Sequence, residues 1–170
     1  MSLTLTEISE LLDADEIKHR VNDGAIYTGF ATDLYEDREG DNCANLVLRL
    51  DDDGELLRVQ APLAFTLPKD ATPEIRAAVL ITLHQLNWES KIMQFEIDLE
   101  DGEIRLGADL PLEDGKLTAT QLGRTVRLLP ALLDQAYLPL SDALELGVAM
   151  PTEAELFRRT DAFVRSVELK

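Results

Sequence analysis

Residues 92–110 carry the pattern that most constrains how this chain can fold. Asp101-Gly102 is a favoured pair for a two-residue type I′ turn, in which both residues take positive φ. Counting outward from this turn places apolar residues opposite one another at every second position: Leu99 with Ile104, Ile97 with Leu106, Phe95 with Ala108 and Met93 with Leu110. The other face pairs Asp98 with Arg105, Glu96 with Gly107 and Gln94 with Asp109. The residues therefore predict an antiparallel hairpin with one face in a core and the other in water.

A second hairpin is predicted around Asp53-Gly54, between strands 45–50 and 55–61. Its apolar pairs are Leu50 with Leu57, Leu48 with Val59 and Leu46 with Ala61. The other face opposes Arg49 with Arg58, and like charges directly across a ladder are unfavourable. Either Asp51 and other acids neutralise the two arginines, or this face meets an acidic surface. We favour neutralisation.

The first half of the chain predicts two helices and a further strand. Thr4 or Thr6 can cap a helix with Leu5, Ile8, Leu11 and Leu12 on one stripe, which continues loosely to Val21 and ends at Gly24. Residues 26–35 then have the β-branched and aromatic content of a strand, and 36–42 form a loop. Thr72-Pro73-Glu74 starts a second helix, which runs to about Leu86. Apolar residues cover more than half of its circumference, so we expect it to be the central, buried helix.

A third helix begins at the capping box formed by Thr118 and Gln121. Its apolar stripe is Leu122, Val126, Leu129 and Leu133. Pro130 is expected to kink or divide this helix, and Pro139 to end the segment. Beyond it, residues 140–170 contain a capping box at Thr152 and Glu155 and an apolar pattern typical of a docking helix, with Leu156, Phe157, Phe163, Val164 and Val167.

The predicted order is helix, three strands, helix, two strands, helix, with a helical extension. This order indicates an α+β fold in which helices cover one face of an antiparallel sheet. At 170 residues the chain is long enough for one domain with a sizeable core. We predict a domain over 1–139 and a C-terminal extension over 140–170 that packs on it.

The formal net charge of −17 repels phosphate backbones, so nucleic acid is not an expected partner. Acidity favours basic or apolar protein segments, or serves solubility alone, and we favour solubility. No apolar run is long enough to span a bilayer, and the N-terminus lacks the features of a secretory signal. We therefore expect a cytoplasmic protein with no membrane partner.

No catalytic, cofactor-binding or metal-binding residue is predicted. The acidic turns at 51–54, 98–102 and 114–115 lack a carboxylate at the first position of an EF-hand loop. His19 and His84 lack a second ligand at helical spacing, and the single cysteine, Cys43, has no base or cation beside it in sequence. Trp88 is expected to fill a corner of the core. The chain is therefore not expected to be an enzyme.

The run from Leu86 to Leu140 resembles the YbjN-like proteins. The resemblance lies in Leu86-Asn-Trp-Glu-Ser-Lys, Phe95-Glu-Ile-Asp, Asp101-Gly-Glu-Ile-Arg, Leu110-Pro-Leu-Glu-Asp-Gly-Lys-Leu-Thr and Tyr137-Leu-Pro-Leu. Upstream, only the predicted order of elements agrees. The resemblance implies a type III secretion chaperone-like fold in a bacterial protein-binding or regulatory module that is often dimeric, with no catalytic residues to transfer.

Two hypotheses of function follow. The first is a non-enzymatic chaperone-like or regulatory adaptor, expected as a homodimer, that binds an unidentified polypeptide client along apolar grooves or sheet edges. The second is a small-molecule sensor or enzyme that uses a pocket between the central helix and the sheet.

Overall fold

The computed structural model describes residues 3–113, 115–152 and 155. Within them, three α-helices, six strands and a short 3₁₀ turn follow in the order α1 Leu5–Ala14, β1 Arg20–Asn22, β2 Ala25–Ala31, β3 Cys43–Asp51, η1 Asp52–Gly54, β4 Leu56–Thr66, α2 Pro73–Glu89, β5 Gln94–Ile97, β6 Glu103–Pro111 and α3 Ala119–Leu146.

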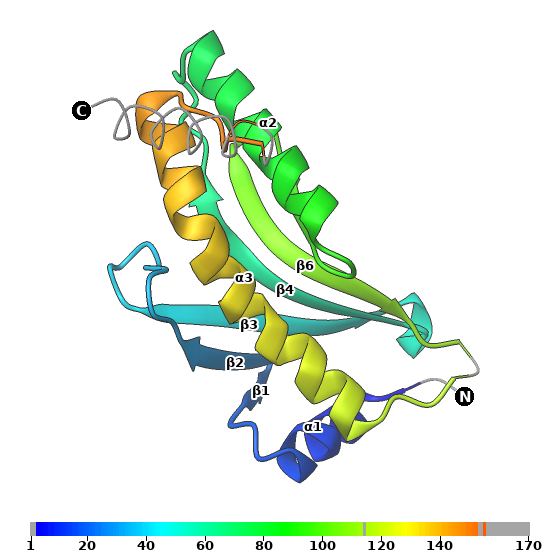
Figure 1. The fold of residues 1–170 in the computed structure, drawn as a ribbon. Helices are drawn as coiled ribbons and strands as arrows, with labels where there is room; N and C mark the ends of the chain where they lie inside the picture. Colours follow the sequence, from blue (N-terminus) through cyan, green and yellow to red (C-terminus); the bar gives the residue numbers. More distant parts are fainter. Residues whose placement is uncertain (1–2, 114, 153–154, 156–170) are drawn as a thin grey trace.

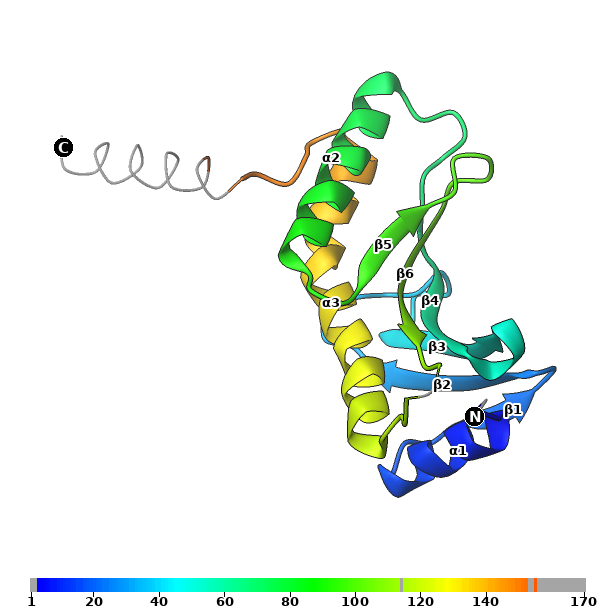
Figure 2. The same cartoon turned by 90° about the vertical axis from the view of Figure 1, so that its right-hand side faces the viewer.

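The six strands form one antiparallel sheet in the order β1-β2-β3-β4-β6-β5. Helix α3 crosses one face of this sheet, with α1 beside its N-terminal half and α2 beside its C-terminal half (Figures 1 and 2). The core lies between the helices and the inward-facing residues of the strands, among them Leu48, Val59 and Leu106, all with no exposed side chain. The predicted α+β architecture, an antiparallel sheet covered by helices on one face, is confirmed.

The β3–β4 hairpin has the predicted register. Leu48 pairs with Val59, Leu50 with Leu57 and Arg49 with Arg58. The favoured neutralisation is confirmed for Arg58, whose Nε lies 3.2 Å from Asp51 Oδ2 and 3.5 Å from Asp109 Oδ2.

The predicted register of the β5–β6 hairpin is wrong by two residues. Ile97 pairs with Ile104 and Phe95 with Leu106, so the same residues still face the core. Instead of a two-residue turn, the loop spans 99–102, where the carboxylates of Asp98 and Asp101 accept the N–H groups of Glu100 and Glu103 at 2.8 and 2.9 Å. These side-chain hydrogen bonds stabilise a wider turn that the Asp-Gly pair alone does not predict. Leu99 is consequently 64% exposed.

The first predicted helix is too long, and a strand was missed. Helix α1 begins after Thr4, the first of the two predicted caps, which forms a capping box with Glu7. The helix ends at Ala14. Residues 20–22 then form β1, which pairs with β2 across a two-residue turn. Asp23 and Gly24 both have positive φ there, 46° and 72°, so the type I′ turn expected at Asp101-Gly102 occurs at this other Asp-Gly pair.

The prediction that Pro139 ends the third helix is wrong. Helix α3 continues through both Pro130 and Pro139 to Leu146, so neither proline divides or ends it. A proline inside a helix costs roughly 3 kcal/mol, but burial of the full inner stripe of α3 offsets this cost, because Leu129, Leu133, Ala136, Leu140 and Ala143 are completely buried.

The central helix is α3 and not α2. Leu80 and Ile81 of α2 are 43% and 51% exposed, so α2 packs on one side only. The N-cap of α2 at Thr72, with Pro73 in the first turn, is as predicted. The predicted boundary at residue 139 falls inside α3, and the expected helix bearing Leu156, Phe157, Phe163, Val164 and Val167 lies outside the described residues.

Candidate functional site: a groove between α3 and β6

The site arises because β5 is shorter than the strand it pairs with. The four residues of β5 cover only Ile104–Gly107 of β6, whereas β6 continues to Pro111. On that side of residues 108–111, no strand lies alongside β6 in the described part of the chain. Helix α2 packs on β5 and on the C-terminal half of α3, so the N-terminal half of α3 and the end of β6 face each other without a covering helix (Figure 2).

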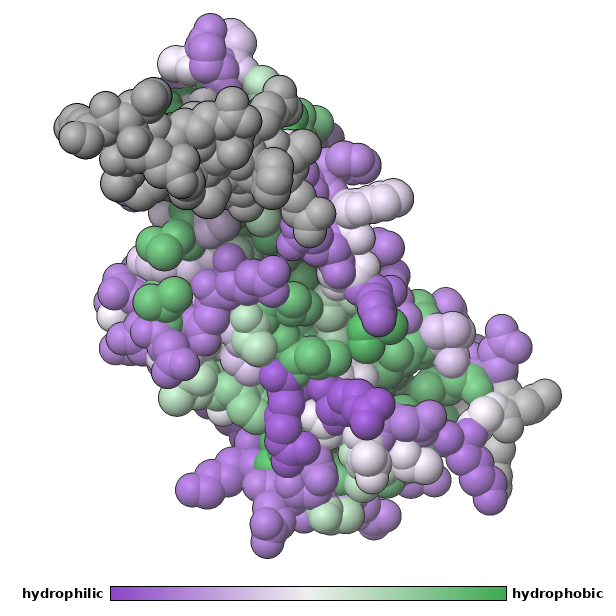
Figure 3. Space-filling view, in the orientation of Figure 1, coloured by the Kyte–Doolittle hydropathy of each residue, from purple (hydrophilic) through white to green (hydrophobic). Residues whose placement is uncertain are grey.

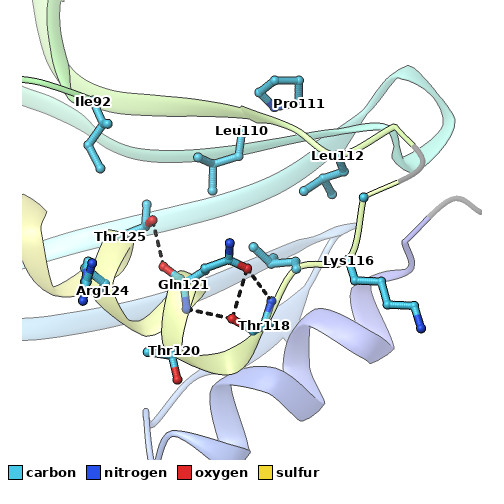
Figure 4. Close-up of a pocket in the computed structure, with 12 residues that line it drawn as sticks. Ile92, Leu110, Pro111, Leu112, Lys116, Thr118, Thr120, Gln121, Arg124 and Thr125 are labelled. Atoms are coloured by element: carbon cyan, nitrogen blue, oxygen red, sulfur yellow. Dashed lines mark hydrogen bonds between the residues drawn. The ribbon is translucent and has the colours of Figure 1, made fainter.

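A groove with a volume of about 690 Å³ occupies this place. In the space-filling view of Figure 3, hydrophobic side chains gather in the trough between α3 and β6, and hydrophilic side chains border it. Figure 4 shows the side chains of Leu110 and Leu112 directed toward α3, while Pro111 points away. With Ile92 and Leu117, these two leucines form the apolar part of the lining.

The α3 side of the groove is polar, and most of its polar groups are already hydrogen-bonded to one another. Thr118 Oγ1 accepts the Gln121 N–H at 3.2 Å, and the Gln121 side chain accepts the Thr118 N–H at 3.0 Å. The Thr125 hydroxyl donates to the Gln121 carbonyl at 3.0 Å. This wall is thus fixed in place by the capping box that starts the helix.

Two cations border the groove. Lys116 lies just before α3 and Arg124 lies in its second turn, and both side chains are exposed (Figure 4). Neither forms an ion pair with any acid that the structure describes. Arg124 also lines a neighbouring hollow of about 350 Å³, in which Arg127 is paired with Asp15.

Trp88 contradicts its prediction as a core residue. It is 85% exposed, the largest value among the exposed hydrophobic residues described. The two residues before it explain why. Leu86 is 5% exposed, and the Asn87 amide accepts the Phe95 N–H at 2.7 Å and donates to the Phe95 carbonyl at 2.9 Å. Since these two positions of α2 face inward, the next one, about 100° further around the helix, faces solvent.

The other residues considered from sequence lie away from the groove. His19 Nε2 is 2.5 Å from the Ser9 hydroxyl and Nδ1 is 2.9 Å from the Ile17 carbonyl, so this histidine joins α1 to the start of the sheet. Cys43 is a free, partly buried thiol. Among the residues that the structure describes, no three His, Cys, Asp or Glu side chains come together as metal ligands, and no helix is long and apolar enough to cross a membrane.

Tyr35 and Asp134 hold the loop 32–42 against the body of the protein, and the pKa of each is shifted. Burial raises the pKa of Tyr35 to about 12, and its hydroxyl donates to the Ala64 carbonyl at 3.2 Å. For Asp134, partial burial opposes ionisation, but backbone N–H donors from three residues outweigh it and lower the pKa. Both groups hold structure, and neither lines the groove.

Comparison with known proteins agrees with this architecture. The family model of YbjN, described as "Putative bacterial sensory transduction regulator", matches residues 4–141. The chain belongs to the YbjN family. The crystal structure of YbjN from E. coli, described as "a putative transcription regulator", is similar to this YbjN-family chain with a TM-score of 0.58 and 14% sequence identity. The similarity covers 80% of this chain and 93% of that one, and it shows a shared fold. No curated protein matches the chain.

Membership confirms the resemblance found in residues 86–140 and extends it to the first helix and the first strands, where the sequence had suggested only a common order of elements. The family description names a regulator and no reaction. In this YbjN-family chain, the groove between α3 and β6 is the candidate binding site.

Proposed function

We propose that this YbjN-family protein is a non-enzymatic regulatory module that binds an extended polypeptide segment in the groove between α3 and β6. The observation that carries the proposal is the position of the groove beside the C-terminal end of β6, which β5 leaves unpaired on one side. A segment lying there could place side chains in the groove and also bond to the backbone of β6.

The backbone of β6 offers hydrogen-bonding groups in the required direction. The Leu112 N–H donates to the Glu55 carbonyl on the β4 side at 2.7 Å, whereas the Glu103 carbonyl accepts the Asp98 N–H on the β5 side at 2.8 Å. Because these directions alternate along a strand, the N–H and carbonyl of Asp109 face the unpaired side. Pro111 follows two residues later, where its missing N–H leaves no unsatisfied donor.

The groove wall favours binding over reaction. A general base or nucleophile needs a polar side chain placed to reach substrate, but Thr118, Gln121 and Thr125 are bonded to one another and to the backbone of α3. What remains open to a ligand is an apolar floor, two cations, the exposed hydroxyl of Thr120 and one strand edge. These features suit recognition of a segment by shape and charge.

A small-molecule ligand is the second candidate, because a volume of about 690 Å³ lies within the usual size range of ligand pockets. The groove lies beside backbone of β6 that β5 leaves unpaired, and an extended segment could bond to this backbone along several residues. We therefore place the polypeptide first.

The proposal is tested by peptide binding to the wild-type protein and to two matched variants. Ile92 lines the groove and is 52% exposed, and Val21 lies on β1 at the opposite edge of the sheet and is 53% exposed. Both Ile92→Asp and Val21→Asp should leave the fold intact, as circular dichroism would verify. Fluorescence anisotropy with labelled eight-residue peptides should show binding that Ile92→Asp weakens about tenfold and Val21→Asp leaves unchanged.

Equal weakening by both variants, or binding unaffected by Ile92→Asp, would place the polypeptide site elsewhere. The homodimer implied by the family resemblance is a separate proposal. Light scattering of the purified protein at several concentrations tests it.

A further inference from the structure

We infer that the groove selects segments in which an apolar side chain lies close to a carboxylate, with Arg124 and Lys116 as the residues that determine this specificity. The inference rests on the proposed function and adds the chemistry of the partner. The apolar side chain would lie against Leu110 and Leu112, and the carboxylate would lie near a cation at the border of the groove.

The first argument is how the cations of this acidic chain are used. Acidic residues outnumber basic ones by 33 to 16, and several arginines already have carboxylate partners. Arg105 Nε lies 2.7 Å from Glu96, Arg58 lies between Asp51 and Asp109, and Arg127 is paired with Asp15. Within the described residues, Arg124 and Lys116 have no such partner, although both border the groove.

The second argument is the placement of these two cations relative to the apolar floor. Arg124 follows Thr120 and Gln121 by four and three residues, so all three occupy one face of α3, the face that lines the groove. Lys116 precedes the helix on the same lining. The helix rises about 8 Å over the five steps from Ala119, at the start of α3, to Arg124, which separates the two cations along the groove (Figure 4). An apolar side chain that enters between them would have a positive charge on either side.

The third argument is the local balance of charge. Among the residues that the structure describes, the lining contains Lys116 and Arg124 but no acidic residue, and the first turn of α3 contains no acid either. Over a chain of net charge −17, an acidic segment is repelled from most of the surface. A cationic groove is then the place where such a segment can bind, and repulsion elsewhere adds to its specificity.

The size of the effect follows from the exposure of both cations. An exposed charge pair contributes up to about 1 kcal/mol to binding. Arg124→Glu removes the pair between Arg124 and the carboxylate of the segment and puts a like charge in its place. The affinity for a Glu peptide should therefore fall about tenfold in low salt. Raising the salt concentration should reduce the difference, because exposed charges are screened.

The experiment uses labelled eight-residue peptides that contain one Leu and one Glu separated by zero to four residues, each paired with the same peptide carrying Gln in place of Glu. Anisotropy is measured with wild-type protein, with Arg124→Glu and with Arg49→Glu. Arg49 is an exposed arginine on the outer face of the sheet, opposite Arg58, and serves as the matched control. Circular dichroism verifies that each variant is folded.

For at least one spacing, wild type should prefer the Glu peptide about fivefold, Arg124→Glu should abolish or reverse the preference, and Arg49→Glu should retain it. Equal binding of Glu and Gln peptides by wild type would overturn this inference and leave the proposed function standing. An equal loss of preference in both variants would also overturn it, since the effect would then come from net charge. Binding of dodecanoate without binding of any peptide would overturn both proposals and favour a small amphipathic anion.

Discussion

Substitution of Asp134 tests how α3 holds the long loop between β2 and β3. The Asp134 carboxylate accepts the N–H groups of three successive residues: Asp33 at 3.1 Å, Leu34 at 2.8 Å and Tyr35 at 2.8 Å. These bonds fix the start of the loop and hold Tyr35, which is 4% exposed, against the ring of Phe65 at a centroid distance of 5.7 Å. Asp134→Ala removes all three acceptor contacts together.

The expected cost follows from the burial of each bond. A buried hydrogen bond to a charged group contributes roughly 1.5–3 kcal/mol. The N–H groups of Asp33 and Leu34 are in exposed residues, so water replaces the lost acceptor there, whereas the bond to Tyr35 is partly buried. The bond to Tyr35 therefore contributes nearly its full value, and the bonds to Asp33 and Leu34 contribute a small fraction each. Asp134→Ala should lower the free energy of unfolding by about 2–3 kcal/mol. Asp134→Asn keeps one acceptor oxygen and should cost about half as much.

The effect should also depend on pH. The pKa of Asp134 is lowered in the folded protein, so the ionised carboxylate contributes its stability above the unfolded pKa of about 4. That contribution is lost as pH falls through the lower pKa of the folded state. Urea denaturation at pH 7 should show the full difference between wild type and Asp134→Asn, and the difference should shrink below pH 4. A loss under about 0.5 kcal/mol at pH 7 for Asp134→Ala would refute the account of this contact.

Two further predictions concern the β5–β6 hairpin. Gly102 and Gly40 have nearly the same φ, +83° and +84°, but a Cβ at Gly102 would lie 2.1 Å from a backbone oxygen, whereas a Cβ at Gly40 meets nothing within 4 Å. Thermal unfolding should therefore show that Gly102→Ala costs more than 2 kcal/mol and Gly40→Ala only about 1 kcal/mol; equal costs would mean that the close approach is unimportant. Asn87→Ala should cost about 2 kcal/mol in the free energy of unfolding, because it leaves the N–H and carbonyl of Phe95 without their partners. If the bond to Asn87 protects the Phe95 amide, hydrogen exchange at that amide should accelerate by at least tenfold in the variant.

The sequence predicts most strongly those features that depend on residues close together in the chain. The capping boxes at Thr4 and Thr118 and the register of the β3–β4 hairpin are all local patterns, and all occur as expected. The neutralisation of Arg58 by Asp51 was also foreseen, although Asp109 comes from a strand distant in sequence.

Where prediction failed, contacts between distant segments outweighed the local preference. Gly102 donates to Asp98 and its carbonyl accepts the N–H of Leu67, which fixes a wider turn than the Asp-Gly pair suggests. Pro130 stays within α3 because the buried stripe of that helix spans it. Trp88 is exposed because Asn87 binds the β5 backbone, a contact with no local sequence signal.

The groove itself could be predicted only in part. The second hypothesis anticipated a pocket between the central helix and the sheet, but it took α2 for the central helix. The site depends on β5 being shorter than β6, a mismatch that appears only once the true register is known. Arg124 and Lys116 carried no sequence signal, because their significance comes from their place on the lining of the groove, where the structure describes no acidic residue.

The most direct test of the central claim is chemical-shift mapping by NMR of the ¹⁵N-labelled protein with the tightest-binding peptide of the Leu–Glu set. If the segment lies in the groove, the amides of Asp109, Leu112 and residues 116–125 should shift, and exchange of the Asp109 amide with solvent should slow on binding. Shifts confined to α2, to β1 or to the outer face of the sheet, with the Asp109 amide unchanged, would contradict the claim.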